Sequence, residues 1–205
     1  RDLPARFAGL PVIGFVRNPW DWYVSMFFDY RRKRQFVFQI LSDQGALDFD
    51  ATVARFLNLG DNSDLSRRLL QRLTNGAPES IDAQRPARNQ LPGLRSVHFA
   101  NYSRGVGYYS WLIRLMFESD QEHPIIFGRF DRLRREALRL FEETGTPITK
   151  RIEAYLTAAP PLNSSPRPGS QFAGYNPETQ QLVAQKDHEL IERFGFGFDE
   201  FSLKK

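Results

Sequence analysis

A short run near the start of the chain combines residues that are suited to binding anions. Arg17, Asn18 and Pro19 follow a short apolar stretch, and Ser25 comes eight residues after Arg17. Arginine presents a forked set of N–H donors that matches phosphate, and a serine hydroxyl can donate one further hydrogen bond. These residue types at this spacing indicate a site for a phosphate group.

The elements expected around this run would bring the two side chains beside one anion. Residues 11–16 are β-branched and aromatic and are bounded by prolines, which predicts a short buried strand. Asn18 followed by Pro19 predicts the start of a helix, and helix N-termini attract anions because several of their amide groups lack internal partners. Ser25 would lie about 9 Å along this helix from Pro19, at 1.5 Å per residue. A phosphate lying alongside the helix could therefore contact both Arg17 and Ser25.

The rest of the chain alternates between helical patterns, a second strand and two irregular stretches. The first helix is expected to run to about Arg34, with basic residues in its last turn. A second buried strand is expected over residues 124–130. Further helices are expected over residues 50–74 and 103–117, from a cap at Asp131 to Gly145, and from Asn176 to Gly195, with long irregular stretches over 75–96 and 157–175. Strands separated by helices predict a single α/β domain over residues 1–205 with a parallel sheet.

The run around Arg17 resembles the sulfotransferase family, whose members carry the pattern Arg-Asn/Asp-Pro-x-Asp/Glu-x-x-x-Ser. Arg17, Asn18, Pro19, Asp21 and Ser25 reproduce this pattern with the spacing of the family. In that family the arginine and the serine hold the 3′-phosphate of 3′-phosphoadenosine 5′-phosphosulfate (PAPS). The resemblance implies transfer of a sulfuryl group from PAPS to a hydroxyl or amine acceptor. It also implies a P-loop-like, three-layer α/β domain with a central parallel sheet.

Two later segments resemble the family in the same order along the chain. Residues 127–133 are similar to the family's strand that ends in Tyr-Glu-Asp-Leu. Residues 163–169, followed by a last helix that ends in Phe-Gly-Phe at 194–196, resemble its C-terminal block. This resemblance makes Arg167 a second phosphate ligand and Gly169 a backbone donor. A flexible linker rich in Pro, Gly and Ser is the alternative interpretation of the same stretch.

The sequence departs from the family in the part of the site that performs the chemistry. Family members open with a strand and a Pro-Lys-x-Gly-Thr-type loop that holds the 5′-phosphosulfate, and this sequence contains no such loop. The catalytic His or Glu of the family usually lies upstream of the arginine, where this chain has neither residue. The catalytic residues are therefore unassigned, and we expect the N-terminal strand and its loop to be missing from residues 1–205.

Other candidates for a role in the site have a plainer interpretation. His98 lies between the two irregular stretches and could act in catalysis, although a satisfied or exposed histidine fits it better. Tyr108, Tyr109 and Trp111 could line a pocket for the acceptor, but their helical spacing favours the hydrophobic core. The arginines of residues 132–139 are expected to form a solvated helix face.

Composition restricts the class of protein further. The absence of cysteine excludes disulfides, iron–sulfur clusters and a thiol nucleophile, and three scattered histidines give no metal spacing, so we expect no metal cofactor. No apolar run approaches the ~20 residues of a membrane span, and no signal peptide opens the chain. These features predict a cytoplasmic protein without a membrane span.

The net charge of +4 suits an anionic ligand and does not call for nucleic acid. We expect a small-molecule or glycan acceptor, whose identity and the oligomeric state the sequence does not indicate. Two other functions stay open. A P-loop kinase or NTPase relative would need a Gly-Lys-Ser/Thr loop, which the sequence lacks. A non-enzymatic basic anion-binding module would need interleaved aromatic and basic residues, for which Trp22 and Tyr23 are the only hint.

Overall fold

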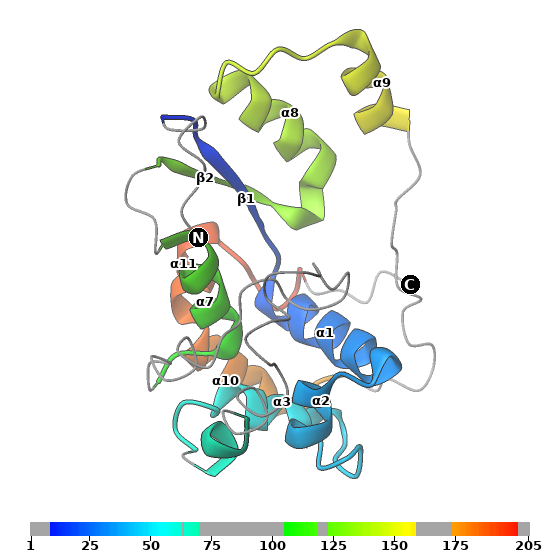
Figure 1. Ribbon diagram of the computed structural model, residues 1–205, viewed down its shortest axis with the longest axis vertical. Coiled ribbons are helices and arrows are strands. Elements are labelled where there is room, and N and C mark those ends of the chain that lie inside the picture. Colours follow the sequence, from blue (N-terminus) through cyan, green and yellow to red (C-terminus); the bar gives the residue numbers. More distant parts are fainter. Residues whose placement is uncertain (1–8, 63, 70–104, 119–122, 159–173, 201–205) are drawn as a thin grey trace, which may run out of the picture.

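A computed structural model, shown in Figure 1, describes residues 9–62, 64–69, 105–118, 123–158 and 174–200. Two strands, β1 (Val12–Val16) and β2 (Ile125–Arg129), pair in parallel. Both strands were predicted from the sequence, and their parallel pairing is confirmed. The register joins Val16 to Arg129, so Arg17 and Arg129 stand at the same carboxyl edge of the sheet.

The remaining described elements are helical. After β1 come α1 (Pro19–Lys33), α2 (Phe36–Leu41), α3 (Phe49–Leu57) and a helical segment at residues 64–69. β2 is preceded by α7 (Tyr108–Ile113) and the π-helical turn η2 (Arg114–Glu118). It is followed by the 3-10 turn η3 (Phe130–Arg132), α8 (Leu133–Glu143) and α9 (Lys150–Ala158). The last two helices are α10 (Pro177–Lys186) and α11 (His188–Phe194). The described part of the chain is therefore a mostly helical α/β structure with a two-stranded parallel sheet, and a three-layer arrangement around a larger sheet is not seen in it.

Helical segments contact both faces of the strand pair. Gly128 faces α8, where an added Cβ would lie 3.0 Å from Leu140. Gly14 faces the opposite side, where an added Cβ would lie 2.7 Å from Phe127 and 2.9 Å from Phe117 of η2. Glycine at these two positions lets neighbouring side chains approach the sheet closely.

The core lies around α1, at the end of the molecule away from α8 and α9 (Figure 1). It is rich in aromatic residues, and its buried rings include Trp20, Tyr23, Phe27, Phe56, Tyr108 and Trp111. Edge-to-face contacts such as Phe27 with Phe38, whose ring centres are 5.3 Å apart, add to the apolar burial. No helix within the described ranges is long and apolar enough to cross a membrane.

The start and end of α1 agree with the sequence. Asn18 is the N-cap, and its side-chain oxygen accepts a hydrogen bond from the backbone N–H of Trp20 at 3.1 Å. Pro19 occupies the first helical position. The helix ends at Lys33, because Arg34 adopts the left-handed conformation with φ 49°. The predicted end at about Arg34 is confirmed.

Three other helix predictions were wrong in part. The predicted helix over 50–74 is interrupted after Leu57, and residues 64–69 are helical again. The helix predicted from residue 103 is not yet formed at 105–107, where Gly105 has φ 80°, and begins at Tyr108. The single helix predicted up to Gly195 is two helices that break at Asp187.

The predicted cap of α8 was also wrong. Its N-cap is Arg132, which makes no side-chain capping bond. The carboxylate of Asp131 instead accepts two hydrogen bonds from Arg129, at 3.0 and 3.1 Å. Ala137 and Leu140 of this helix are buried, whereas Leu133 at its start is exposed.

Candidate anion-binding site

Arg17 leaves the end of β1 and is held there by three contacts. Its backbone N–H donates a hydrogen bond to the Tyr109 hydroxyl at 2.8 Å. Its Nε donates to the carboxylate of Asp21, with which it forms an ion pair. Its guanidinium carbon lies 5.4 Å from the centre of the Phe130 ring. The side chain is 25% exposed, so it is accessible to a ligand while its position is fixed.

Among the described residues, these contacts leave the two terminal nitrogens of Arg17 available. Asp21 engages Nε, and within the described part of the chain the terminal nitrogens Nη1 and Nη2 take part in no hydrogen bond or ion pair. The two terminal nitrogens are the donors with which arginine can grip a phosphate or sulfate group in a bidentate manner. Asp21 therefore orients the guanidinium group without occupying this pair of donors.

Ser25 lies on the same face of α1 as Asp21. Residues four apart on a helix are neighbours on its surface, so Asp21 and Ser25 stand one above the other. Because Asp21 holds Nε of Arg17, the guanidinium group is tied to the helix face that carries Ser25. Ser25 is half-buried. That one anion lying along α1 contacts both residues stays a prediction.

The start of α1 offers fewer free amides than the sequence suggested. Pro19 has no N–H, and the N–H of Trp20 is already bonded to Asn18. The N–H of Trp22 donates to the Asn18 carbonyl at 2.9 Å. Attraction of an anion at this helix end therefore depends more on the side chain of Arg17 than on the backbone.

The C-terminal segment packs against the same helix start. The side-chain amide of Asn18 donates to the carbonyl of Gly197 at 2.9 Å. Trp20 donates from its indole N–H to the Gln180 carbonyl at 3.0 Å, and its own carbonyl accepts from the Tyr175 hydroxyl at 2.7 Å. Segments from opposite ends of the sequence are therefore in contact at the start of α1.

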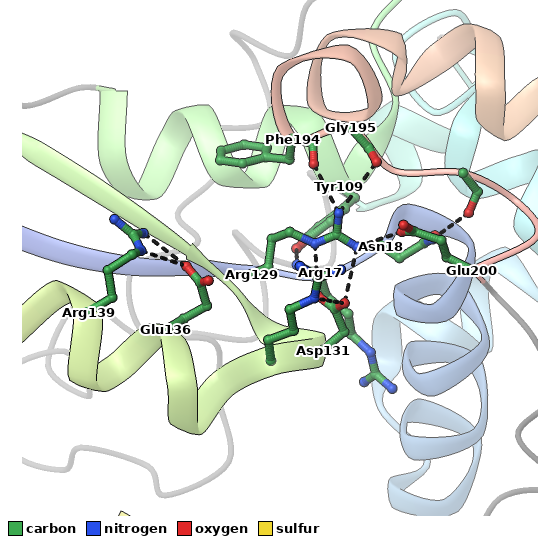
Figure 2. A network of polar contacts seen from close by, with 12 residues as sticks. Arg17, Asn18, Tyr109, Arg129, Asp131, Glu136, Arg139, Phe194, Gly195 and Glu200 are labelled. Atoms are coloured by element: carbon green, nitrogen blue, oxygen red, sulfur yellow. Dashed lines mark hydrogen bonds and ion pairs between the residues drawn. The ribbon is translucent and has the colours of Figure 1, made fainter.

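A second arginine at this edge of the sheet was missed by the sequence analysis. Arg129 ends β2 as Arg17 follows β1, but Figure 2 shows that acceptors surround its guanidinium group. The acceptors are both carboxylate oxygens of Asp131, the carboxylate of Glu200 at 2.5 Å, and the carbonyls of Phe194 and Gly195 at 3.3 and 3.4 Å. The guanidinium carbon also lies 4.6 Å from the centre of the Phe196 ring.

The environment of Arg129 keeps it charged. Burial by itself would lower its pKa, but hydrogen bonds and the charges of Asp131 and Glu200 outweigh burial and raise it. All three nitrogens of its guanidinium group already donate to acceptors of the protein. Arg129 therefore anchors the C-terminal segment and has no fork to offer a ligand.

The other predicted site residues have different outcomes. Arg167, Gly169 and His98 lie outside the described residues. Tyr108, Tyr109 and Trp111 are 0%, 3% and 5% exposed, which confirms their interpretation as core residues. The arginines of residues 132–139 are exposed, as predicted for a solvated helix face.

Comparisons with known proteins do not assign the site. No family model matches the sequence, and no curated protein or solved structure matches it either. Among the described residues, no group of three His, Asp or Glu side chains is placed to hold a metal ion. The function of the site must therefore be inferred from Arg17 and its neighbours.

Proposed function

We propose that this protein is a PAPS-dependent sulfotransferase in which Arg17 and Ser25 bind the 3′-phosphate of the nucleotide. One observation carries the proposal: Asp21 ties Nε of Arg17 to the helix face that bears Ser25, and the terminal nitrogens stay unengaged by the described residues. This is the arrangement that the Arg-to-Ser spacing of the family would require. It also gives the acidic residue of that pattern a physical role.

The chemistry of a 3′-phosphate suits this set of donors. A terminal phosphate presents three oxygens, of which two can accept from the fork of Arg17 and the third from the Ser25 hydroxyl. The position at the carboxyl edge of parallel strands is where open α/β sheets bind their ligands. Arg167 and Gly169 belong to the same proposal as a second phosphate ligand and a backbone donor.

The transfer step itself requires groups that are not assigned here. In-line transfer of a sulfuryl group loads negative charge on its oxygens, which donors or cations must stabilise. We propose that a phosphosulfate-binding loop outside residues 1–205 supplies them within a P-loop-like three-layer domain. The parallel pairing of β1 with β2 and the helical contacts on both faces support such a domain. A cytoplasmic location and a small-molecule or glycan acceptor complete the proposal.

Nucleotide discrimination tests this function. We expect the full-length protein to bind adenosine 3′,5′-bisphosphate about tenfold to a hundredfold more tightly than adenosine 5′-monophosphate in calorimetric titrations. That ratio corresponds to the ~1.5–3 kcal/mol of a charge-assisted hydrogen bond. Equal affinity for the two nucleotides would refute the assignment.

A second measurement separates the enzyme from a non-enzymatic anion-binding module, because the terminal nitrogens of Arg17 could bind an anion in either. We expect release of adenosine 3′,5′-bisphosphate from PAPS when the protein is supplied with a panel of hydroxyl and amine acceptors. Discrimination between the nucleotides without such release across the panel would favour the binding module.

A further inference from the structure

Tyr109 connects the anion site to the interior of the protein. Its hydroxyl accepts the hydrogen bond from the backbone N–H of Arg17. Its ring stacks on Trp22, with ring centres 4.4 Å apart and planes inclined by 14°. Its own backbone N–H donates to the Tyr23 hydroxyl at 3.1 Å. The residue is 3% exposed, so it can shift little within its surroundings.

A buried carboxylate holds Tyr109 and its helix in place. Asp187 is fully buried between α10 and α11, where its carboxylate accepts from the Tyr23 hydroxyl at 2.9 Å. It also accepts from both the backbone N–H and the hydroxyl of Ser110, at 2.9 and 2.6 Å. Gly107 allows this approach, because a Cβ there would lie 2.4 Å from a carboxylate oxygen of Asp187. The start of α7 is therefore fixed from the junction of the last two helices.

The protonation of Tyr109 suits the contact with Arg17. Burial raises the pKa of its phenol well above the ordinary value, and the charge of Asp187 adds to this effect, while the contacts with Arg17 oppose it. The hydroxyl is therefore neutral at physiological pH. A neutral hydroxyl can accept from the Arg17 amide and keeps its own proton.

We infer that Tyr109 is a positioning residue for Arg17, and that Asp187 supports it through Tyr23 and Ser110. The hydroxyl of Tyr109 fixes the backbone amide of Arg17, at the point where the chain leaves β1. Asp21 then fixes the side chain at Nε. Because both the backbone amide and Nε of Arg17 are held, the side chain loses little further conformational entropy when its terminal nitrogens bind an anion. This inference rests on the proposed function, since it assigns Tyr109 to the same phosphate site.

Removal of one hydroxyl tests the inference. Tyr109→Phe keeps the stacking on Trp22 and removes only the acceptor for the Arg17 amide. Tyr108→Phe is the matched control, because Tyr108 is fully buried at the preceding position of the same helix. Hydrogen exchange of the Arg17 amide reports the contact directly. Titration with adenosine 3′,5′-bisphosphate and adenosine 5′-monophosphate reports its effect on binding.

We expect Tyr109→Phe to accelerate exchange of the Arg17 amide and to weaken bisphosphate binding about fivefold, the fold-change for one neutral hydrogen bond. Binding of the monophosphate should be unchanged, and Tyr108→Phe should behave as wild type in both measurements. The inference is overturned if Tyr109→Phe keeps wild-type discrimination, or if the two variants lose it equally. Wild-type protein that does not discriminate would refute the proposed function instead.

A second variant guards against misfolding of the first. Asp187→Asn keeps the side-chain volume but replaces one accepting oxygen with a donor, which should loosen Tyr23 and Ser110. We expect a folded protein, checked by circular dichroism, whose discrimination between the nucleotides falls as in Tyr109→Phe. Folded Asp187→Asn protein with wild-type discrimination would show that Asp187 stabilises the fold without positioning Arg17.

Discussion

The two strands of the sheet each lead into an arginine, and the two arginines differ in what surrounds them. Arg129 at the end of β2 donates to two carboxylates and two carbonyls of the protein itself. Among the residues that the structure describes, the guanidinium group of Arg17 after β1 gives only its Nε, to Asp21. Position at the carboxyl edge of a sheet therefore does not make an arginine a ligand-binding residue. What matters is how many guanidinium nitrogens have no acceptor among the described residues and can therefore bind a ligand.

The difference arises from the segments that reach each strand end. The chain returns from α11 directly over Arg129, so that the carbonyls of residues 194 and 195 and the carboxylate of Glu200 meet its guanidinium group (Figure 2). At Arg17 the acidic partner is Asp21, in the first turn of α1, and its carboxylate pairs with Nε. Arg129 is thus part of the fold, whereas Arg17 is the arginine that we propose for the anion site.

The largest effect is expected for the anchoring arginine. Arg129→Ala should lower the free energy of unfolding by about 3 kcal/mol, because it leaves Asp131, Glu200 and two carbonyls without their donor. Urea denaturation measures this change. Arg135→Ala, on the exposed face of α8, is the control and should stay within about 0.5 kcal/mol of wild type. Arg129→Ala protein as stable as the control would remove the contrast between the two arginines.

The next effect is expected in binding. Arg17→Ala should weaken binding of adenosine 3′,5′-bisphosphate about tenfold to a hundredfold, since the charge-assisted bond to phosphate contributes ~1.5–3 kcal/mol. Stability should fall by about 1 kcal/mol at most, because a half-buried pair that stays accessible to water, as Arg17 with Asp21 does, contributes little. Nucleotide titration and urea denaturation of the same variant give both values. A stability loss as large as that of Arg129→Ala, with binding unchanged, would make Arg17 a second anchor.

A charge-conserving change sharpens the comparison. Arg17→Lys keeps a positive charge but loses the fork and the Nε that Asp21 holds. We expect its affinity for the bisphosphate to fall between those of wild type and Arg17→Ala, and calorimetry measures it. If Arg17→Lys binds as tightly as wild type, the site uses charge alone and bidentate geometry has no role.

Local patterns in the sequence were sufficient for the elements that carry the site. A short β-branched run predicted β1, and a capping Asn18 before Pro19 predicted where α1 begins. The spacing of four between Arg17 and Asp21, and again between Asp21 and Ser25, could also have predicted the ion pair that orients the guanidinium group. These features depend on neighbours within two helical turns, so one segment determines them.

Contacts between distant segments could not be predicted in this way. The acceptors of Arg129 include Glu200, and the acceptor of the Arg17 amide is Tyr109, each far away along the chain. Asp187 lies at the break between α10 and α11, where its carboxylate accepts hydrogen bonds from Tyr23 and Ser110. The residues next to it in the sequence favour a continuous helix, so the break could not be predicted from them. A single sequence does not indicate which donors such tertiary contacts will occupy.

The smallest effect is expected at Ser25, the neutral partner in the site. Ser25→Ala removes one hydroxyl from the face of α1 that Asp21 shares, and a neutral hydrogen bond contributes about 1 kcal/mol. We therefore expect about fivefold weaker binding of adenosine 3′,5′-bisphosphate, with unchanged affinity for adenosine 5′-monophosphate. Stability should be preserved, because alanine favours the helix at a half-buried position. If binding of the two nucleotides weakens equally, Ser25 supports the helix rather than the 3′-phosphate, and Arg17 would have to discriminate between them without it.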